Sequence, residues 1–253
     1  MYIDIRLLPS VPGSRSLSCR VVVVIDILRA TSVIVHAMSQ GAREVIPVKT
    51  VEEALRIAKT FHPKTILLGG ERGSRKIEGF DLGNSPREYE AEKVKGKRLI
   101  LTTTNGTKAF HAVSSAEKVL VGSFFNIRAI AEECFKLGQD LLIYPSGDEG
   151  NFSLEDTVCG GMLIDGIVKK AGGSITLTDA SRSAHILFQR FEPKIVESFY
   201  LSKHGRDLID RGFEEDLPYC AQVDTTNLVP VFEDGVIRIS PTRSLSPLGR
   251  GEG

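Results

Sequence analysis

The sequence predicts an α/β fold in which helices cover both faces of a mainly parallel or mixed sheet, giving three layers. Short apolar runs alternate with helical patterns from residue 20 to residue 171, which is typical of right-handed strand–helix–strand units. Residues 21–25 are an unbroken run of Val and Ile without polar alternation, as expected for a strand that is covered on both faces.

Apolar, β-branched runs bounded by turn residues predict the strands in chain order. The predicted strands are 2–7, 21–25, 44–48, 65–68, 98–101, 118–121, 141–144 and 175–178. Residues 228–232 and 236–239, joined through Asp234 and Gly235, predict a hairpin near the end of the chain.

Apolar residues at helical spacing, preceded by capping residues, predict the helices. The predicted helices are 31–38, 51–61, 126–137, 155–171, 180–191 and 194–211. Ser85 with Glu88 predicts a further helix start, and Ser153 with Asp156 has the same capping-box spacing. The glycine-rich residues 69–84 predict a long loop.

The chain of 253 residues is long enough for one large α/β domain. We expect this domain to span residues 1–240, and we expect residues 241–253, rich in Ser, Pro, Gly and Arg, to form a disordered tail. The pattern changes after Gly172 and Gly173, which leaves open a division into two lobes near residue 172.

Lys plus Arg number 32, as do Asp plus Glu, so no net charge attracts nucleic acid or an anionic membrane. No apolar run reaches membrane-spanning length, and no signal peptide opens the sequence. The four cysteines are widely spaced, which suits a reducing cytoplasm. We therefore expect a cytoplasmic protein without nucleic-acid or membrane partners. The sequence leaves open whether it is a monomer or a homodimer.

Charged and hydroxyl side chains gather where the predicted strands end, and parallel sheets bind their ligands at that edge. Asp26 and Arg29 follow the buried strand and are the candidate catalytic residues. Arginines beside hydroxyl groups, amides and glycines suit a phosphate or carboxylate. The candidate substrate-binding residues are Arg72, Asn84, Ser85, Thr103, Thr104, Asn105, Gly106 and Arg128.

Several carboxylates also fall at this edge, where they would repel an anion unless a hard cation lay between them. Mg²⁺ prefers such oxygen ligands and neutralises charge in phosphoryl transfer. The sequence therefore predicts metal-assisted chemistry on a small polyanionic phosphate ester. The candidate metal ligands are Asp26, Glu71, Glu155 and Asp156.

Simpler structural roles remain open for some of these residues. Asp26 is a common helix N-cap type, and acids at a helix start such as Glu155 and Asp156 interact favourably with the helix dipole. Arg128 and Glu132 are spaced for an ion pair on a helix surface. The sequence lacks GxxxxGK[ST] and GxGxxG, which argues against a nucleotide triphosphatase and a dinucleotide site.

Five segments, in order along the chain, resemble the 2-phosphosulfolactate phosphatase family of coenzyme M biosynthesis. They are DILRATS at 26–32, LLGGERGSRKIEGFDLGNSP at 67–86, LTTTNGTKA at 101–109, GSFFNIRA at 122–129 and FSLEDTVCGG at 152–161. The resemblance implies a family-specific α/β topology. It also implies an Mg²⁺-dependent phosphatase that converts (2R)-2-phospho-3-sulfolactate to (2R)-3-sulfolactate and phosphate.

Two alternatives stay open: a phosphatase for another small 2-phospho acid, and a non-catalytic anion-binding protein. The acidic residues distinguish catalysis from binding. Asp26, Glu155 and Asp156 would repel the ligand of a protein that only binds anions.

Overall fold

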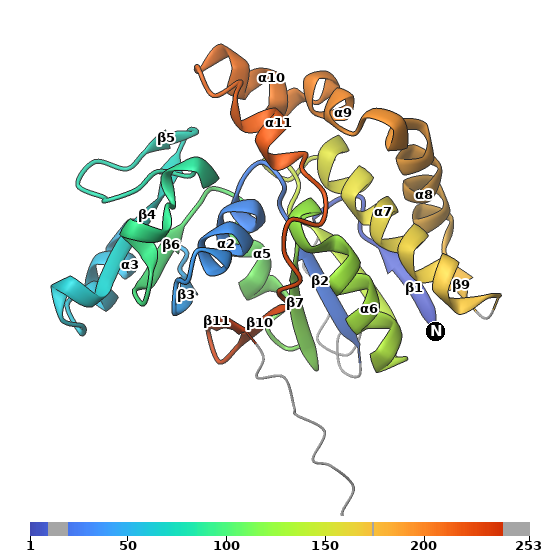
Figure 1. Ribbon diagram of the computed structural model, residues 1–253, viewed down its shortest axis with the longest axis horizontal. Helices are drawn as coiled ribbons and strands as arrows, with labels where there is room; N and C mark the ends of the chain where they lie inside the picture. Colours follow the sequence, from blue (N-terminus) through green and yellow to red (C-terminus); the bar gives the residue numbers. More distant parts are fainter. Residues whose placement is uncertain (10–19, 174, 240–253) are drawn as a thin grey trace, which may run out of the picture.

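The computed structural model describes residues 1–9, 20–173 and 175–239 and confirms the expected α/β fold (Figure 1). The predicted tail, residues 241–253, lies outside the described residues. The strands are β1 (Tyr2–Ile5), β2 (Val21–Ile25), β3 (Glu44–Pro47), β4 (Ile66–Arg72), β5 (Arg75–Lys76), β6 (Arg98–Thr102), β7 (Lys118–Gly122), β8 (Leu141–Pro145), β9 (Thr176–Leu177), β10 (Pro230–Glu233) and β11 (Val236–Ile239).

Helices cover both faces of the sheet (Figure 1). The α-helices are α2 (Ala30–Ser39), α3 (Val51–Ala58), α4 (Ala91–Val94), α5 (Gly106–Ala112), α6 (Ile127–Leu137), α7 (Leu154–Ala171), α8 (Asp179–Phe191), α9 (Val196–Leu201), α10 (Lys203–Asp210) and α11 (Asp216–Cys220). Short 3₁₀ helices are η1 (Pro63–Thr65), η2 (Pro86–Glu88), η3 (Phe124–Asn126) and η4 (Glu192–Lys194). Among the described residues, no helix combines the length and the apolar character needed to cross a membrane.

All of these strands join one mixed sheet, in the spatial order β5-β4-β6-β3-β11-β10-β7-β2-β8-β1-β9. β2 lies inside it, parallel to both β7 and β8. Every residue of β2 is at most 1% exposed. Val21, Val23 and Ile25 belong to the core cluster that includes α6 and α7, whereas Val22 and Val24 belong to the cluster that includes α2 and α5. An apolar run without alternation therefore does mark a strand with two buried faces.

The C-terminal hairpin occupies the middle of the sheet. β10 pairs antiparallel with β7, and β11 pairs antiparallel with β3, so the hairpin joins two groups of parallel strands. Glu44 on β3 fixes this arrangement, because its carboxylate accepts hydrogen bonds from Arg98 of β6 and Arg238 of β11.

Three sequence expectations were wrong in detail. β4 continues through Gly69 to Arg72 and turns back into β5, where a loop was expected. The seven-residue helix α5 was not predicted. The expected helix 194–211 is divided at Ser202, whose hydroxyl caps α10 by accepting a hydrogen bond from the Gly205 amide. A Cβ atom at Gly205 would lie 1.9 Å from the Phe199 carbonyl oxygen, so only glycine allows this sharp bend.

The helix expected after Ser85 is also shorter than predicted. The capping box of Ser85 and Glu88 forms, but it begins the single turn η2, and α4 spans only four residues. The C-terminal helices α9, α10 and α11 lie beyond the carboxyl ends of the central strands (Figure 1). They therefore stand over the edge where the candidate site residues were expected.

Candidate active site

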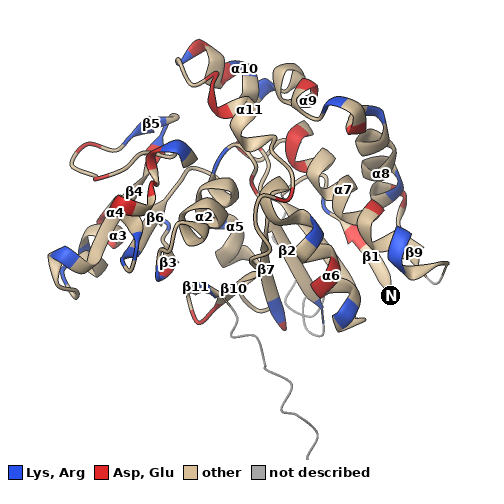
Figure 2. Ribbon diagram, in the orientation of Figure 1, with Lys and Arg blue, Asp and Glu red and all other residues tan. Residues whose placement is uncertain are grey.

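A cavity of about 130 Å³ lies at the carboxyl edge of the sheet, under the C-terminal helices. Acidic and basic residues of several elements lie around this region (Figure 2). The predicted site residues that line the cavity are Asp26, Arg29, Glu71, Asn84, Thr103, Thr104 and Asn105. The polar lining residues that the sequence analysis missed are Ser74, Asp148, Glu149, Lys203, His204, Asp207 and Arg211.

Asp26 follows β2 and is only 6% exposed. One of its carboxylate oxygens accepts a hydrogen bond from the Ala30 amide at the start of α2, at 3.0 Å. The other accepts a hydrogen bond from the Ser146 hydroxyl at 2.8 Å. Burial raises the pKa of Asp26, although these two hydrogen bonds oppose the increase. The N-cap of α2 is Arg29, so Asp26 is not the N-cap residue that the simpler interpretation expected. Its carboxylate nevertheless accepts the first amide of the helix, and the residue lines the cavity.

Glu155 and Asp156 lie buried behind Asp26, at the start of α7. Oδ1 of Asp156 accepts a hydrogen bond from the Ile27 amide at 2.8 Å, and its Oδ2 is 3.5 Å from the same Ser146 hydroxyl that contacts Asp26. Burial raises the pKa of both acids, and the neighbouring charges of Glu155 and Asp26 raise the pKa of Asp156 further. Three carboxyl groups thus share one buried region.

Arg29 is held by a buried ion pair with Asp216 of α11. Its Nη1 atom lies 2.5 Å from Oδ2 of Asp216, and the two side chains are 1% and 2% exposed. The Ser85 hydroxyl donates to the other Asp216 oxygen at 2.6 Å, and Nη2 of Arg29 donates to the Ser74 carbonyl at 3.1 Å. The Arg29 guanidinium also stacks 4.3 Å above the Phe213 ring. Ser85 therefore positions Arg29 through Asp216.

Glu71 links two loops at the cavity. One of its oxygens accepts a hydrogen bond from the Ser74 amide at 2.8 Å, and the other accepts one from the Thr104 amide at 2.7 Å. The segment from Thr103 to Asn105 then leads into α5. A Cβ atom at Gly106 would lie 2.6 Å from the Asp26 carboxylate, so glycine lets the start of α5 approach this acid.

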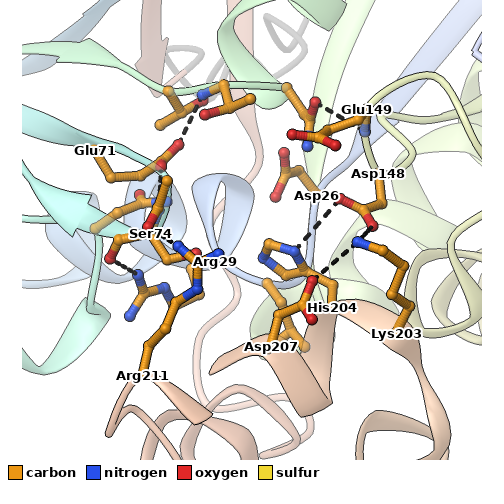
Figure 3. A pocket seen from close by; sticks show the side chains of 16 residues that line it. Asp26, Arg29, Glu71, Ser74, Asp148, Glu149, Lys203, His204, Asp207 and Arg211 are labelled. Atoms are coloured by element: carbon orange, nitrogen blue, oxygen red, sulfur yellow. Dashed lines mark hydrogen bonds and ion pairs between the residues drawn. The ribbon is translucent and has the colours of Figure 1, made fainter. Parts of the chain in front are cut away.

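The opposite wall carries a second charged cluster, from α10 and the loop after β8 (Figure 3). The Lys203 ammonium lies 2.7 Å from Asp148 and 2.9 Å from Asp207. His204 Nδ1 lies 3.6 Å from the other Asp148 oxygen. Ligand atoms of Asp148, His204 and Asp207 lie within 4.8 Å of one another, so this cluster could hold a metal ion. Among the described residues, the predicted metal ligands Asp26, Glu71, Glu155 and Asp156 do not form a group of three this close.

Opposing effects act on the two central groups of this cluster. Burial lowers the pKa of His204, but the hydrogen bond with Asp148 and the charges of Glu155 and Asp26 raise it overall. The hydrogen bond from His204 lowers the pKa of Asp148, and that from Lys203 adds to the effect. Each group therefore favours the charged form of the other.

Four of the predicted substrate-binding residues, Arg72, Ser85, Gly106 and Arg128, do not line this cavity. Arg72 follows Glu71 within β4, and consecutive strand residues face opposite sides, so its guanidinium instead donates to the Thr102 hydroxyl at 2.9 Å. The Arg128 side chain is 60% exposed and lies near Asp224 rather than pairing with Glu132. In contrast, Asn84 lines the cavity, and its buried amide oxygen has no hydrogen-bond partner among the described residues.

Most of the missed residues fall into two groups. Asp148 and Glu149 lie in the loop that follows the predicted strand 141–144, so the same strand-end rule could have found them. Lys203, His204 and Arg211 come from a helix segment about 180 residues after Asp26, and no local pattern ties that helix to the sheet edge. Only the chain's tertiary packing brings them to the site.

The protein is thus an α/β protein with a pocket of acidic and basic side chains at the carboxyl edge of its sheet. The chain belongs to the 2-phosphosulpholactate phosphatase family, whose pattern it matches over residues 9–235. This match confirms the resemblance that the five sequence segments indicated.

Relatives from three bacteria support the assignment, and each is named as a probable 2-phosphosulfolactate phosphatase. The Caldanaerobacter subterraneus subsp. tengcongensis protein is 44% identical over 228 residues, covering 90% of this chain and 94% of its own length. The Clostridium novyi protein is 44% identical over 233 residues, covering 92% and 97%. The Thermotoga petrophila protein is 42% identical over 234 residues, covering 92% and 96%.

Proposed function

We propose that the protein is an Mg²⁺-dependent phosphatase that hydrolyses (2R)-2-phospho-3-sulfolactate to (2R)-3-sulfolactate and phosphate. Family membership supports the class of reaction. The observation that carries the proposal for this site is the buried Asp26 carboxylate, which faces a cavity also lined by Arg29 and by the segment from Thr103 to Asn105. Such a cavity can bind several anionic groups around one reactive acid.

The acids behind the cavity suit a hard cation. Asp26 and Asp156 share the Ser146 hydroxyl, and the buried Oε2 atom of Glu155 has no hydrogen-bond partner among the described residues. Carboxylate oxygens are the donors that Mg²⁺ prefers, whereas a histidine nitrogen is more typical of zinc and other transition metals. We therefore assign the metal to Asp26, Glu155 and Asp156, with Glu71 at the opposite loop. When bound there, Mg²⁺ would neutralise charge on the phosphoryl group.

Hydrolysis breaks the bond between phosphorus and the ester oxygen. The oxygen of water ends on phosphorus, and one proton ends on the ester oxygen to give the free alcohol. Arg29, Thr103 and Asn105 would hold the anionic oxygens in place. Asp26 would either bind the metal or attack phosphorus itself; in the second case a transient aspartyl phosphate is hydrolysed afterwards.

The first experiment measures phosphate release from racemic 2-phosphosulfolactate, phospholactate, phosphoenolpyruvate and an aryl phosphate. EDTA should abolish release from the sulfonated substrate, and added Mg²⁺ should restore it. If only the other esters are hydrolysed, the protein is a phosphatase but 2-phosphosulfolactate is not its substrate. No release from any ester, together with metal-independent phosphate binding, would favour the anion-binding alternative.

We expect Asp26→Asn to lower kcat by roughly 10³-fold or more, because the amide is neither a nucleophile nor an anionic metal ligand. Asp81→Asn is the matched control, since Asp81 is exposed and accepts only the Leu68 amide. Acid quenching followed by hydroxylamine trapping would detect a phosphoenzyme in the wild type. Such an intermediate is expected if Asp26 attacks phosphorus and is not expected if Asp26 only binds the metal. Full turnover by Asp26→Asn would refute the central role of this residue.

The expected cytoplasmic location and the link to coenzyme M synthesis also remain proposals. Free, buried thiols at Cys134, Cys159 and Cys220 support a reducing compartment. Cell fractionation with an antibody against the protein would test the location.

A further inference from the structure

The cations that line the cavity differ in how their charge is compensated. Arg29 is paired with Asp216, Lys203 lies between Asp148 and Asp207, and His204 faces Asp148. Arg211 also lines the cavity, but no described carboxylate lies within ion-pairing distance of it. Its charge is therefore available to an anionic ligand.

One turn orients the two arginines of the cavity. The residues between β4 and β5 have positive φ angles of 57° at Gly73 and 64° at Ser74. Their consecutive carbonyl groups accept hydrogen bonds from the two guanidinium groups: Gly73 from Arg211, and Ser74 from Arg29. Figure 3 shows Arg211 and Arg29 beside Ser74 on the same side of the cavity. Because Arg211 uses one nitrogen on this carbonyl, its remaining N–H donors stay free for a ligand.

The anionic groups of the proposed substrate are expected to lie at different depths in the cavity. Asp26 is buried at the end of β2, whereas Arg211 follows α10 and is exposed at the rim. In 2-phospho-3-sulfolactate the carboxylate is attached to the same carbon as the phosphate ester, and the sulfonate is one carbon further away. With phosphorus at Asp26, the sulfonate is one carbon further from the phosphate ester than the carboxylate is, so it can reach further toward the rim.

We infer that Arg211 binds the sulfonate group and is a specificity-determining residue of this site. The inference rests on the proposed function, because it places the phosphate at Asp26. A guanidinium matches an oxyanion with paired donors, and the uncompensated charge of Arg211 favours a substrate that carries one more anionic group. Arg29, already neutralised by Asp216, contributes donors without a net charge.

The test compares kcat/KM for 2-phosphosulfolactate and 2-phospholactate, which differ only in the sulfonate. Arg211→Gln should reduce the preference for the sulfonated ester by about ten-fold or more, mainly through KM, as expected for loss of a charge-assisted hydrogen bond. Arg211→Lys should retain part of the preference. Arg206→Gln is the matched control, because Arg206 is an exposed cation of α10, the helix just before Arg211, and does not line the cavity. This control should leave the preference as in the wild type.

An equal loss for both esters would overturn the inference, because it would place Arg211 at the phosphate or the carboxylate. An unchanged preference would overturn it as well. Calorimetric binding of 3-sulfolactate and lactate gives a readout that does not need turnover. If the wild type hydrolyses neither ester but binds 3-sulfolactate in an Arg211-dependent way, the proposed function fails and the sulfonate site stands.

Discussion

The carboxyl group of Asp156 combines a structural and a chemical role. Its oxygens accept hydrogen bonds from the Ile27 amide and the Ser146 hydroxyl, so it ties α7 to the residues after β2 and β8. Burial and the charges of Glu155 and Asp26 also raise its pKa. A cation in this region would relieve the repulsion among the three acids, whereas without metal the region favours a bound proton.

This pKa shift predicts how the stability of the metal-free protein depends on pH. An acid whose pKa is higher in the folded state keeps its proton at pH values where the unfolded chain has lost it. The free energy of unfolding therefore falls as pH rises through that window, by at most about 1.4 kcal/mol per pH unit for each proton. We expect Asp156→Asn in EDTA to show a shallower fall than the wild type as pH rises above 3.8, the ordinary pKa of an aspartate.

Urea unfolding at a series of pH values would measure this difference. Asp140→Asn is the control, since Asp140 is exposed and accepts a hydrogen bond from the Tyr2 amide. Equal slopes for the wild type and Asp156→Asn would contradict the prediction.

Helix α11 contributes to the site through one side chain. Asp216 reaches Arg29 and Ser85, which are 187 and 131 residues away in the sequence. The ion pair is almost completely excluded from water, at 1% and 2% exposure. Removing one partner of such a pair leaves an uncompensated buried charge, which is more costly than the loss of an exposed pair.

We therefore expect Asp216→Ala to lower the free energy of unfolding by about 3–5 kcal/mol. Glu215→Ala is the matched control from the adjacent position, because its ion pair with Arg87 is exposed at the surface. This control should cost no more than about 1 kcal/mol. Chemical denaturation of both variants measures the two values. Similar values would mean that the Arg29–Asp216 pair is not the main anchor of α11.

The whole sheet depends on a hairpin from the end of the described chain. Ile237 of β11 is fully buried and pairs in register with Val45 of β3, while Phe232 of β10 packs 5.4 Å from the Phe110 ring. Within the described sheet, the two parallel groups of strands are thus hydrogen-bonded to each other only through β10 and β11. The hairpin is expected to couple the two groups into one cooperative unit.

We expect Ile237→Ala to lower the free energy of unfolding by about 2–5 kcal/mol, because it leaves a cavity at the centre of the sheet. Ile239→Ala is the control in the same strand, since Ile239 is 41% exposed. It should change stability by about 0.5 kcal/mol or less. Denaturation followed by both circular dichroism and fluorescence would test coupling as well, because separate transitions in the wild type would contradict a single cooperative unit.

Local sequence patterns were sufficient to predict the elements whose arrangement follows the general rules of parallel sheets. The apolar run 21–25 predicted the buried strand, and the strand-end rule predicted that Asp26 and the segment from Thr103 to Asn105 would meet at one edge. These predictions hold because the length and apolar pattern of a segment decide its type, and because parallel strands present their carboxyl ends together.

Tertiary structure alone decided the remaining features. The central position of the hairpin, the pairing of Arg29 with Asp216, and the wall formed by Lys203, His204 and Arg211 all join segments far apart in the sequence. The sequence by itself thus determined the α/β class and one charged edge of the sheet. It did not determine the opposite wall, because the docking of the C-terminal helices depends on packing between surfaces that have no local signature.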